Sequence, residues 1–157
     1  MGAGGIGGYF GARLIQSGVD VTFLLRDKRH AKIKAEGLVI ETPKETFAVK
    51  PKAITKDQLK PEYDLIVLAP KSFDFADALA SLEGASSKGV FLPFLNGLDH
   101  IHQLDDRYGK DRVMVIGLPH MKKLQEIFWH CAKTFSRNVD QREIKLCCIH
   151  AQRFNSR

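Results

Sequence analysis

The stretch Gly2-Ala3-Gly4-Gly5-Ile6-Gly7 decides the fold, because its spacing matches G-x-G-x-x-G. In that pattern the first glycine permits a tight turn, the second lets the backbone approach a pyrophosphate, and the third lets a helix pack closely on a strand. Residues 6–17 follow with a helical pattern that Gly18 is placed to end. Because the first N–H groups of a helix attract phosphate, this stretch predicts a dinucleotide-binding loop.

Strand-like and helical segments alternate through residues 1–117. Apolar runs typical of buried strands lie at residues 21–25, 64–69, 89–95 and 112–116, and helical patterns lie at residues 26–35, 73–82 and 98–108. Residues 38–49 form two short alternating runs around Pro43, which favours a hairpin inserted at the sheet edge. This order predicts an α/β fold, a Rossmann-like doubly wound parallel sheet with right-handed crossovers.

Two parts are expected along the chain. Residues 1–117 are predicted to be an NADP(H)-binding Rossmann-like domain, and residues 118–157 a divergent tail, the remnant of a link to a missing helical domain. Within this tail, residues 120–135 favour a helix, whereas residues 143–157 have little sustained periodicity. We therefore expect a short irregular or helical C-terminal tail.

Charge and composition exclude several classes of protein. The net charge of +6 is concentrated in residues 118–157, which carry +5, and no nucleic-acid-binding fold is recognisable around them, so no nucleic-acid partner is expected. The chain has no run of about 18 apolar residues and no secretory signal, which predicts a cytoplasmic protein without a membrane span.

The cysteines and histidines predict no metal site. Cys131, Cys147 and Cys148 lack the CxxC spacing of a zinc site and are an odd number for a disulfide framework. His120 and His130 are ten residues apart without a nearby acidic ligand.

The residue that ends the second strand of such a domain distinguishes NAD from NADP. A carboxylate there binds the ribose 2′-hydroxyl, whereas a cation accommodates the 2′-phosphate. Arg26 stands at that position, with Lys28 and Arg29 close behind, which favours NADP(H). Asp27 would favour NAD if the strand ended one residue later. The alternative is that these cations are simply the solvated start of a helix.

Four segments together resemble the 2-dehydropantoate 2-reductase family, also called ketopantoate reductase. They are Gly2-Ala-Gly-Gly-Ile-Gly-Gly-Tyr-Phe-Gly-Ala-Arg-Leu14, Val21-Thr-Phe-Leu-Leu-Arg26, Ala69-Pro-Lys-Ser-Phe-Asp74 and Pro93-Phe-Leu-Asn-Gly-Leu-Asp-His100. The resemblance implies an oxidoreductase that reduces a small 2-keto acid, 2-dehydropantoate, with NADPH in pantothenate and coenzyme A synthesis.

The resemblance also implies roles for particular residues. Arg26 would hold the 2′-phosphate, and Lys71 and Asn96 would line the cofactor and substrate side of the site. The residues that would hold the pyrophosphate are Gly2, Ala3, Gly4, Gly5, Ile6 and Gly7. Lys71 and Asn96 both follow predicted parallel strands, whose carboxyl ends bind ligands in open α/β sheets. From the residues alone, Lys71 could equally be a surface lysine and Asn96 part of an ordinary Asn-Gly turn.

Two departures from the family pattern affect the expected activity. Met1 stands directly before Gly2, where the family has an apolar first strand, so we expect the neighbouring strands to lack a hydrogen-bonding partner. The family's helical second domain, which supplies a catalytic lysine, is also expected to be missing. We therefore predict no catalytic residue, and a non-catalytic truncated nucleotide-binding module is the alternative function. No oligomeric state follows from the sequence.

Overall fold

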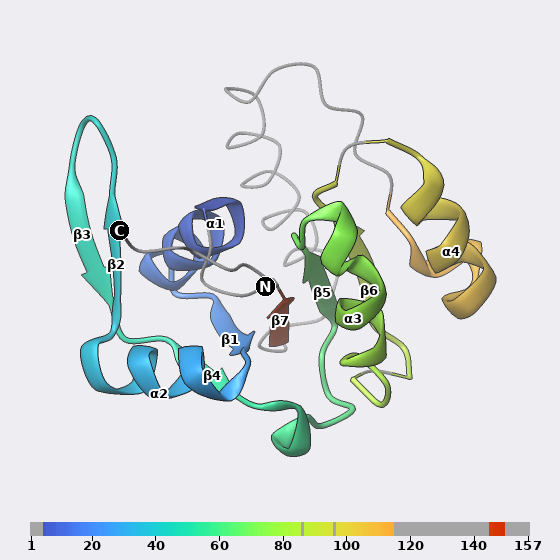
Figure 1. Cartoon of the computed structure of the whole chain (residues 1–157), viewed down its shortest axis with the longest axis horizontal. Coiled ribbons are helices and arrows are strands. Elements are labelled where there is room, and N and C mark those ends of the chain that lie inside the picture. The colour runs from blue at the N-terminus through green and yellow to red at the C-terminus, as the bar shows by residue number, and fades with distance from the viewer. Residues whose placement is uncertain (1–4, 86, 96, 115–144, 150–157) are drawn as a thin grey trace.

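The computed structural model describes residues 5–85, 87–95, 97–114 and 145–149, which Figure 1 colours along the chain. The helices are α1 (Gly5–Gln16), α2 (Asp27–Glu36), α3 (Phe75–Ala80) and α4 (Asp99–Tyr108), with 3-10 turns η1 (Lys56–Gln58), η2 (Ser72–Asp74) and η3 (Lys110–Arg112). The strands are β1 (Asp20–Leu24), β2 (Leu38–Glu41), β3 (Thr46–Val49), β4 (Lys52–Ile54), β5 (Leu65–Leu68), β6 (Val90–Pro93) and β7 (Lys145–Ile149).

Five of these strands form one sheet in the order β4-β1-β7-β5-β6, and every adjacent pair runs parallel. The predicted parallel α/β sheet is therefore confirmed. Its apolar strand residues divide between two cores, one on each face. Phe23, Val67 and Leu92 belong to one core, and their neighbours in sequence, such as Ile66 and Phe91, belong to the other. This is the alternation expected of a sheet that is covered on both faces.

Helices cover both faces of the sheet, as a doubly wound fold requires. On one face α1 contributes Phe10 and Leu14 to the first core. On the other face α3 and α4 contribute Phe75 and Leu104 to the second core. In Figure 1 these helices lie on opposite sides of the strands. The helix that begins at the glycine-rich stretch is thus anchored directly on the sheet.

The boundaries of α1 follow from local chemistry. Gly18 has a φ of +83°, a backbone conformation that glycine adopts without strain, and this ends the helix where the sequence predicts. Gly11 faces the sheet, because a Cβ added there would overlap the Phe23 ring. Small residues on this side of α1 therefore allow the close approach of helix and strand.

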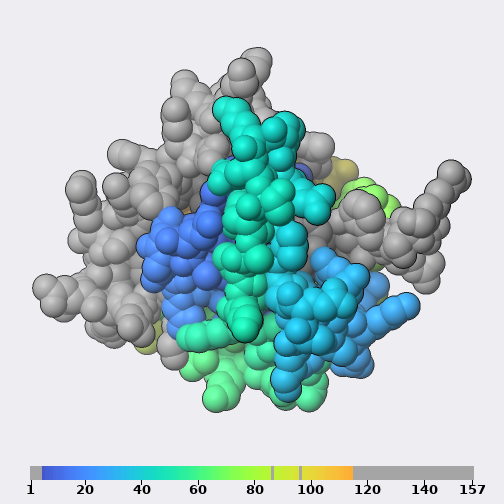
Figure 2. All heavy atoms as spheres, turned by 90° about the vertical axis from the view of Figure 1, so that its left-hand side faces the viewer, coloured from blue at the N-terminus to red at the C-terminus, as the bar shows by residue number. Residues whose placement is uncertain are grey.

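The predicted hairpin is present as a separate two-stranded antiparallel sheet. Leu38 pairs with Val49 and Glu41 with Thr46. Figure 2 shows the hairpin running along the surface beside α1, and the two elements are in contact. The strand β4, which follows the hairpin and forms the edge of the main sheet beside β1, was not predicted from the sequence.

One expectation about the sheet is wrong. The strands on either side of the supposed missing position do have a partner, because β7 lies between β1 and β5. Cys147 is in register with Thr22 on one side and with Ile66 on the other. An open position in a parallel sheet presents unpaired backbone donors and acceptors on both sides, which favours any short extended segment that can reach it. Part of the tail, expected to be irregular or helical, is therefore a strand.

Of the last predicted strand, residues 112–116, the structure describes residues 112–114. Arg112 closes the η3 turn, and Val113 makes a single parallel bridge to Phe91. Residues 115 and 116 lie outside the described residues, as does the helix predicted for residues 120–135.

Candidate nucleotide-binding site

The candidate site lies at the carboxyl edge of the five-stranded sheet. From β1 the chain builds the sheet outward to β4, and from β5 it builds outward to β6 in the opposite direction. Such a reversal of strand order is the topological switch point at which open α/β sheets bind their ligands. Ligand-binding residues are therefore expected at the carboxyl ends of β1 and β5, on the two sides of β7.

The helical half of the glycine-rich stretch begins at this region. Gly5 opens α1, Ile6 is exposed and Gly7 is buried. A Cβ on Gly5 would meet no atom within 4 Å, which agrees with Gly5 standing at a variable position of the motif. Gly2, Ala3 and Gly4 lie outside the described residues. The N-terminus of a 12-residue helix, the end of a helix that attracts phosphate, thus lies within this stretch.

Arg26 lies between β1 and α2. It is the residue before the first turn of α2, and its carbonyl accepts hydrogen bonds from the N–H groups of Arg29 and His30. Just before it, the Leu25 N–H donates to the Ile54 carbonyl at 2.9 Å, which fixes this segment against β4. The sequence prediction placed Arg26 at this strand end, and Asp27 follows it as the first residue of α2.

The Arg26 guanidinium reaches across the edge to two carboxylates. Its Nη2 lies 3.4 Å from Asp74 Oδ1 and 3.2 Å from Asp77 Oδ2. The Arg26 side chain is 58% exposed, that of Asp74 15% and that of Asp77 79%. Sequence reasoning did not assign these two acids to the site. Their spacing of three residues at the start of a predicted helix was the available signal, because such residues share one helix face.

Lys71 opens the segment that follows β5. It precedes the η2 turn, its side chain is exposed, and its ammonium lies 5.7 Å from the centre of the Phe73 ring. Arg26 is joined to this segment through Asp74 and Asp77. Asn96 lies outside the described residues, next to Gly97, which has a φ of +87°.

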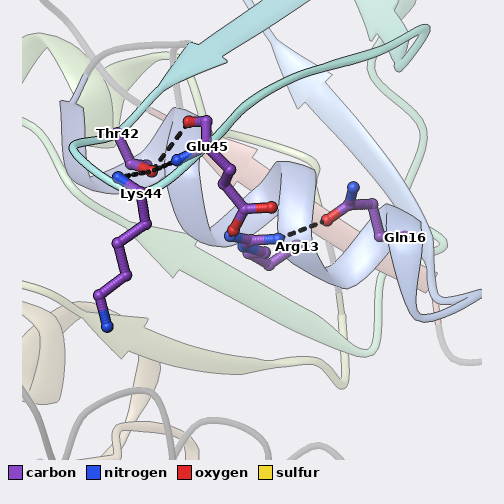
Figure 3. A network of polar contacts seen from close by, with 5 residues as sticks. All are labelled: Arg13, Gln16, Thr42, Lys44 and Glu45. Carbon is purple, nitrogen blue, oxygen red and sulfur yellow. Dashed lines mark hydrogen bonds and ion pairs between the residues drawn. The ribbon is translucent and has the colours of Figure 1, made fainter.

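A second polar network holds the hairpin on α1 (Figure 3). Arg13 donates to Gln16 Oε1 at 3.0 Å and to the Glu45 carboxylate, and its guanidinium lies 4.2 Å from the centre of the Phe47 ring. The hydrogen bond to Glu45 raises the pKa of Arg13, and Tyr9 adds to this effect. Because these partners come from both elements, the network fixes the hairpin to the helix that carries the glycine-rich stretch.

The described residues include neither a metal-binding cluster nor a membrane-spanning helix. Within the described ranges, no group of three or more histidine, cysteine or acidic side chains is placed to bind a metal ion. The helices described here are all too short or too polar to cross a bilayer.

Comparisons with known proteins agree with this architecture. Residues 1–134 match the family model "Ketopantoate reductase PanE/ApbA". The chain is 36% identical over 115 residues to the uncharacterized oxidoreductase YkpB of Bacillus subtilis strain 168, covering 73% of this chain and 38% of that protein. It is also 36% identical over 111 residues to 2-dehydropantoate 2-reductase of Pyrococcus abyssi strain GE5, covering 70% of this chain and 36% of that protein. The chain thus spans less than two fifths of the length of these curated relatives.

Solved structures show the same fold. The ternary structure of D-mandelate dehydrogenase with NADH and anilino(oxo)acetate matches with a TM-score of 0.64 at 24% identity, over 71% of this chain and 37% of that one. A crystal structure from Enterococcus faecalis, named as a candidate 2-dehydropantoate 2-reductase, matches with a TM-score of 0.63 at 18% identity, over 94% of this chain and 55% of that one. The Rossmann-like fold predicted from the sequence is therefore confirmed.

Proposed function

Since the chain belongs to the ketopantoate reductase family, we propose that it binds NADP(H) at the carboxyl edge of its sheet and acts in the NADPH-dependent reduction of a 2-keto acid. Curated relatives named 2-dehydropantoate 2-reductase support 2-dehydropantoate as that acid. The reaction would serve pantothenate and coenzyme A synthesis, in the cytoplasm. Residues 1–117 are the proposed nucleotide-binding part.

The position of Arg26 carries this proposal. It is a cation between the end of β1 and the start of α2, the place where a Rossmann-like domain meets the adenine-side ribose of its cofactor. A guanidinium there can donate two parallel hydrogen bonds to a 2′-phosphate. The pyrophosphate would lie on the N–H groups of the glycine-rich stretch, residues 2–7, where the positive end of the α1 dipole favours it.

The remaining assignments concern the reacting end of the cofactor. When bound, NADPH supplies the hydride that reduces a keto carbon. Lys71 and Asn96 follow β5 and β6, and we place them on the nicotinamide and substrate side of the site. An exposed ammonium such as Lys71 can stabilise negative charge on a substrate oxygen or carboxylate. No described residue is assigned as the general acid.

A second candidate function is a nucleotide-binding module that performs no reduction. The matches to curated relatives cover 38% and 36% of those proteins, so the activity of the whole proteins is not carried over to this chain without a test. Both candidates require NADPH binding, and they differ only in turnover.

Two measurements on the 157-residue chain test these candidates. Titration with NADPH, followed by nicotinamide fluorescence, is expected to show saturable binding; its absence would contradict both. Loss of NADPH absorbance in the presence of 2-dehydropantoate then separates them. Turnover supports the reductase, whereas binding without turnover supports the module. A Lys71→Ala variant, which leaves the proposed phosphate contacts in place, is expected to reduce any turnover while NADPH still binds.

A further inference from the structure

The ion pairs of Arg26 bear on how strongly the site distinguishes NADPH from NADH. Both contacts use the same atom, Nη2, and their lengths of 3.4 and 3.2 Å exceed the roughly 2.7–2.9 Å of a strong charge-assisted hydrogen bond. The Arg26 and Asp77 side chains are 58% and 79% exposed, whereas the Asp74 side chain is 15% exposed. The exposed Arg26–Asp77 pair in particular is easily exchanged for another partner.

The pairs also cross the place where the cofactor is proposed to bind. Arg26 follows β1, whereas Asp74 and Asp77 follow β5, and β7 lies between these two strands. The contacts therefore join residues 48 and 51 positions apart over the switch point of the sheet. A 2′-phosphate that reaches Arg26 must approach these carboxylates as well.

The carboxylates around Arg26 oppose the preference for NADPH over NADH that Arg26 alone would give. Two carboxylates face one guanidinium, so they compete with a 2′-phosphate for its donors and repel the phosphate charge. A ribose 2′-hydroxyl carries no such charge and can donate to a carboxylate. The remaining donors of the guanidinium are still available to a phosphate, so its binding is weakened and not abolished.

We infer that Asp74 and Asp77 are selectivity-determining residues of this site, which narrow its preference for NADPH over NADH by pairing with Arg26. This inference rests on the proposed function. It assigns to the segment after β5 a part in recognising the adenine-side ribose, in addition to the proposed role of Lys71 on the nicotinamide side.

Substitution of the more exposed acid tests the inference first. Asp77→Asn is expected to raise the ratio of NADPH to NADH affinity roughly two- to fivefold, the range that one exposed ion pair supports. Asp77→Glu keeps the charge and is expected to keep the wild-type ratio. Asp106→Asn is the matched control, because it removes the same charge from the exposed face of α4. Its ratio is expected to equal that of the wild type.

The ratio of NADPH to NADH affinity is the informative quantity, since a loss of stability would weaken the binding of both nucleotides alike. The double variant Asp74→Asn/Asp77→Asn is expected to raise the ratio further, and circular dichroism checks that each variant is folded. If the wild type binds NADPH but the single and double variants keep its ratio or lower it, the inference is overturned and the proposed function stands. If the wild type binds neither nucleotide, both are overturned.

Discussion

Gly11 is a residue at which α1 packs closely on the sheet. A Cβ there would overlap the ring of Phe23, which is fully buried in the first core. Interiors are packed too densely for such an atom to be accommodated without movement. Gly5 differs, because it belongs to the same helix but a Cβ there would meet no neighbour within 4 Å. Gly11 therefore serves the close packing of α1 on the sheet, whereas Gly5 does not.

This pair gives a prediction on stability. Gly11 lies in the interior of α1 and Gly5 opens it, so Gly11→Ala gains at least as much helix propensity as Gly5→Ala, and any lower stability of Gly11→Ala reports the cost of overpacking. We expect Gly11→Ala to be less stable than Gly5→Ala by about 1–3 kcal/mol in urea unfolding. Equal unfolding free energies for the two variants would show that α1 does not pack closely on β1 at Gly11.

At the scale of elements, α4 packs on α3 through a buried histidine as well as through apolar residues. His100 is buried and lies edge-on to the Phe75 ring of α3, with the ring centres 6.0 Å apart. Burial lowers the pKa of His100, and the neighbouring Asp99 opposes this shift in part. The packing of α4 on α3 is thus coupled to the protonation of one side chain.

The sign of the pH dependence follows from this lowered pKa. In the unfolded chain a histidine takes up a proton below about pH 6.5, whereas folded His100 stays neutral to a lower pH. The contribution of His100 to stability is therefore complete above about pH 6.5 and is lost as the pH falls from there toward the folded pKa.

We expect His100→Gln to make the unfolding free energy less dependent on pH in this window. Urea unfolding at a series of pH values measures this dependence in the wild type and in the variant. An unchanged slope in His100→Gln would contradict this assignment.

At the scale of the whole molecule, β7 connects the two halves of the sheet. The half that contains β1 and β4 and the half that contains β5 and β6 are joined in the sheet through the two ladders of this one strand. A central parallel strand uses its backbone N–H groups on both sides. The switch point, and with it the Arg26 contacts, therefore depends on a strand that comes from the end of the chain.

A proline within β7 tests this arrangement. Cys147→Pro removes a backbone donor from the centre of the sheet and leaves its acceptor unsatisfied, so it is expected to destabilise the chain by about 1–3 kcal/mol. Cys147→Ala, which keeps the backbone donor at the same position, is the control and is expected to destabilise the chain less than Cys147→Pro does. If the two variants unfold at the same denaturant concentration, β7 does not stabilise the sheet.

Local sequence patterns predicted the parts of this fold that local interactions determine. The helix that Gly18 ends, the hairpin at residues 38–49 and the buried strand at residues 64–69 all appear within a few residues of their predicted bounds. The strand β7 could not be predicted in this way, because its position depends on open backbone donors in distant strands. The short edge strand β4 has polar residues around it, and its periodicity is too weak for it to be predicted from the sequence.

The same distinction holds for the site. The place of Arg26 beside a strand end follows from the order of elements, and the structure has it there. Its contacts with Asp74 and Asp77 join segments about 50 residues apart, and no local pattern specifies such a pairing. The roles of the glycine-rich stretch, Arg26, Lys71 and Asn96 in binding a cofactor stay predictions.

The affinities of the 157-residue chain for NADPH and NADH, measured by titration with and without Arg26→Gln, test the central claim most directly. A hydrogen bond to a charged group contributes about 1.5 kcal/mol. Arg26→Gln is therefore expected to lower the affinity for NADPH roughly tenfold and to leave the affinity for NADH almost unchanged. Arg107→Gln on α4 serves as the charge-matched control. We predict that the wild-type chain binds NADPH more tightly than NADH and that only the Arg26 variant loses this preference. Equal binding of both nucleotides by the wild type, tighter binding of NADH, or an Arg26 variant that keeps the preference would contradict the account.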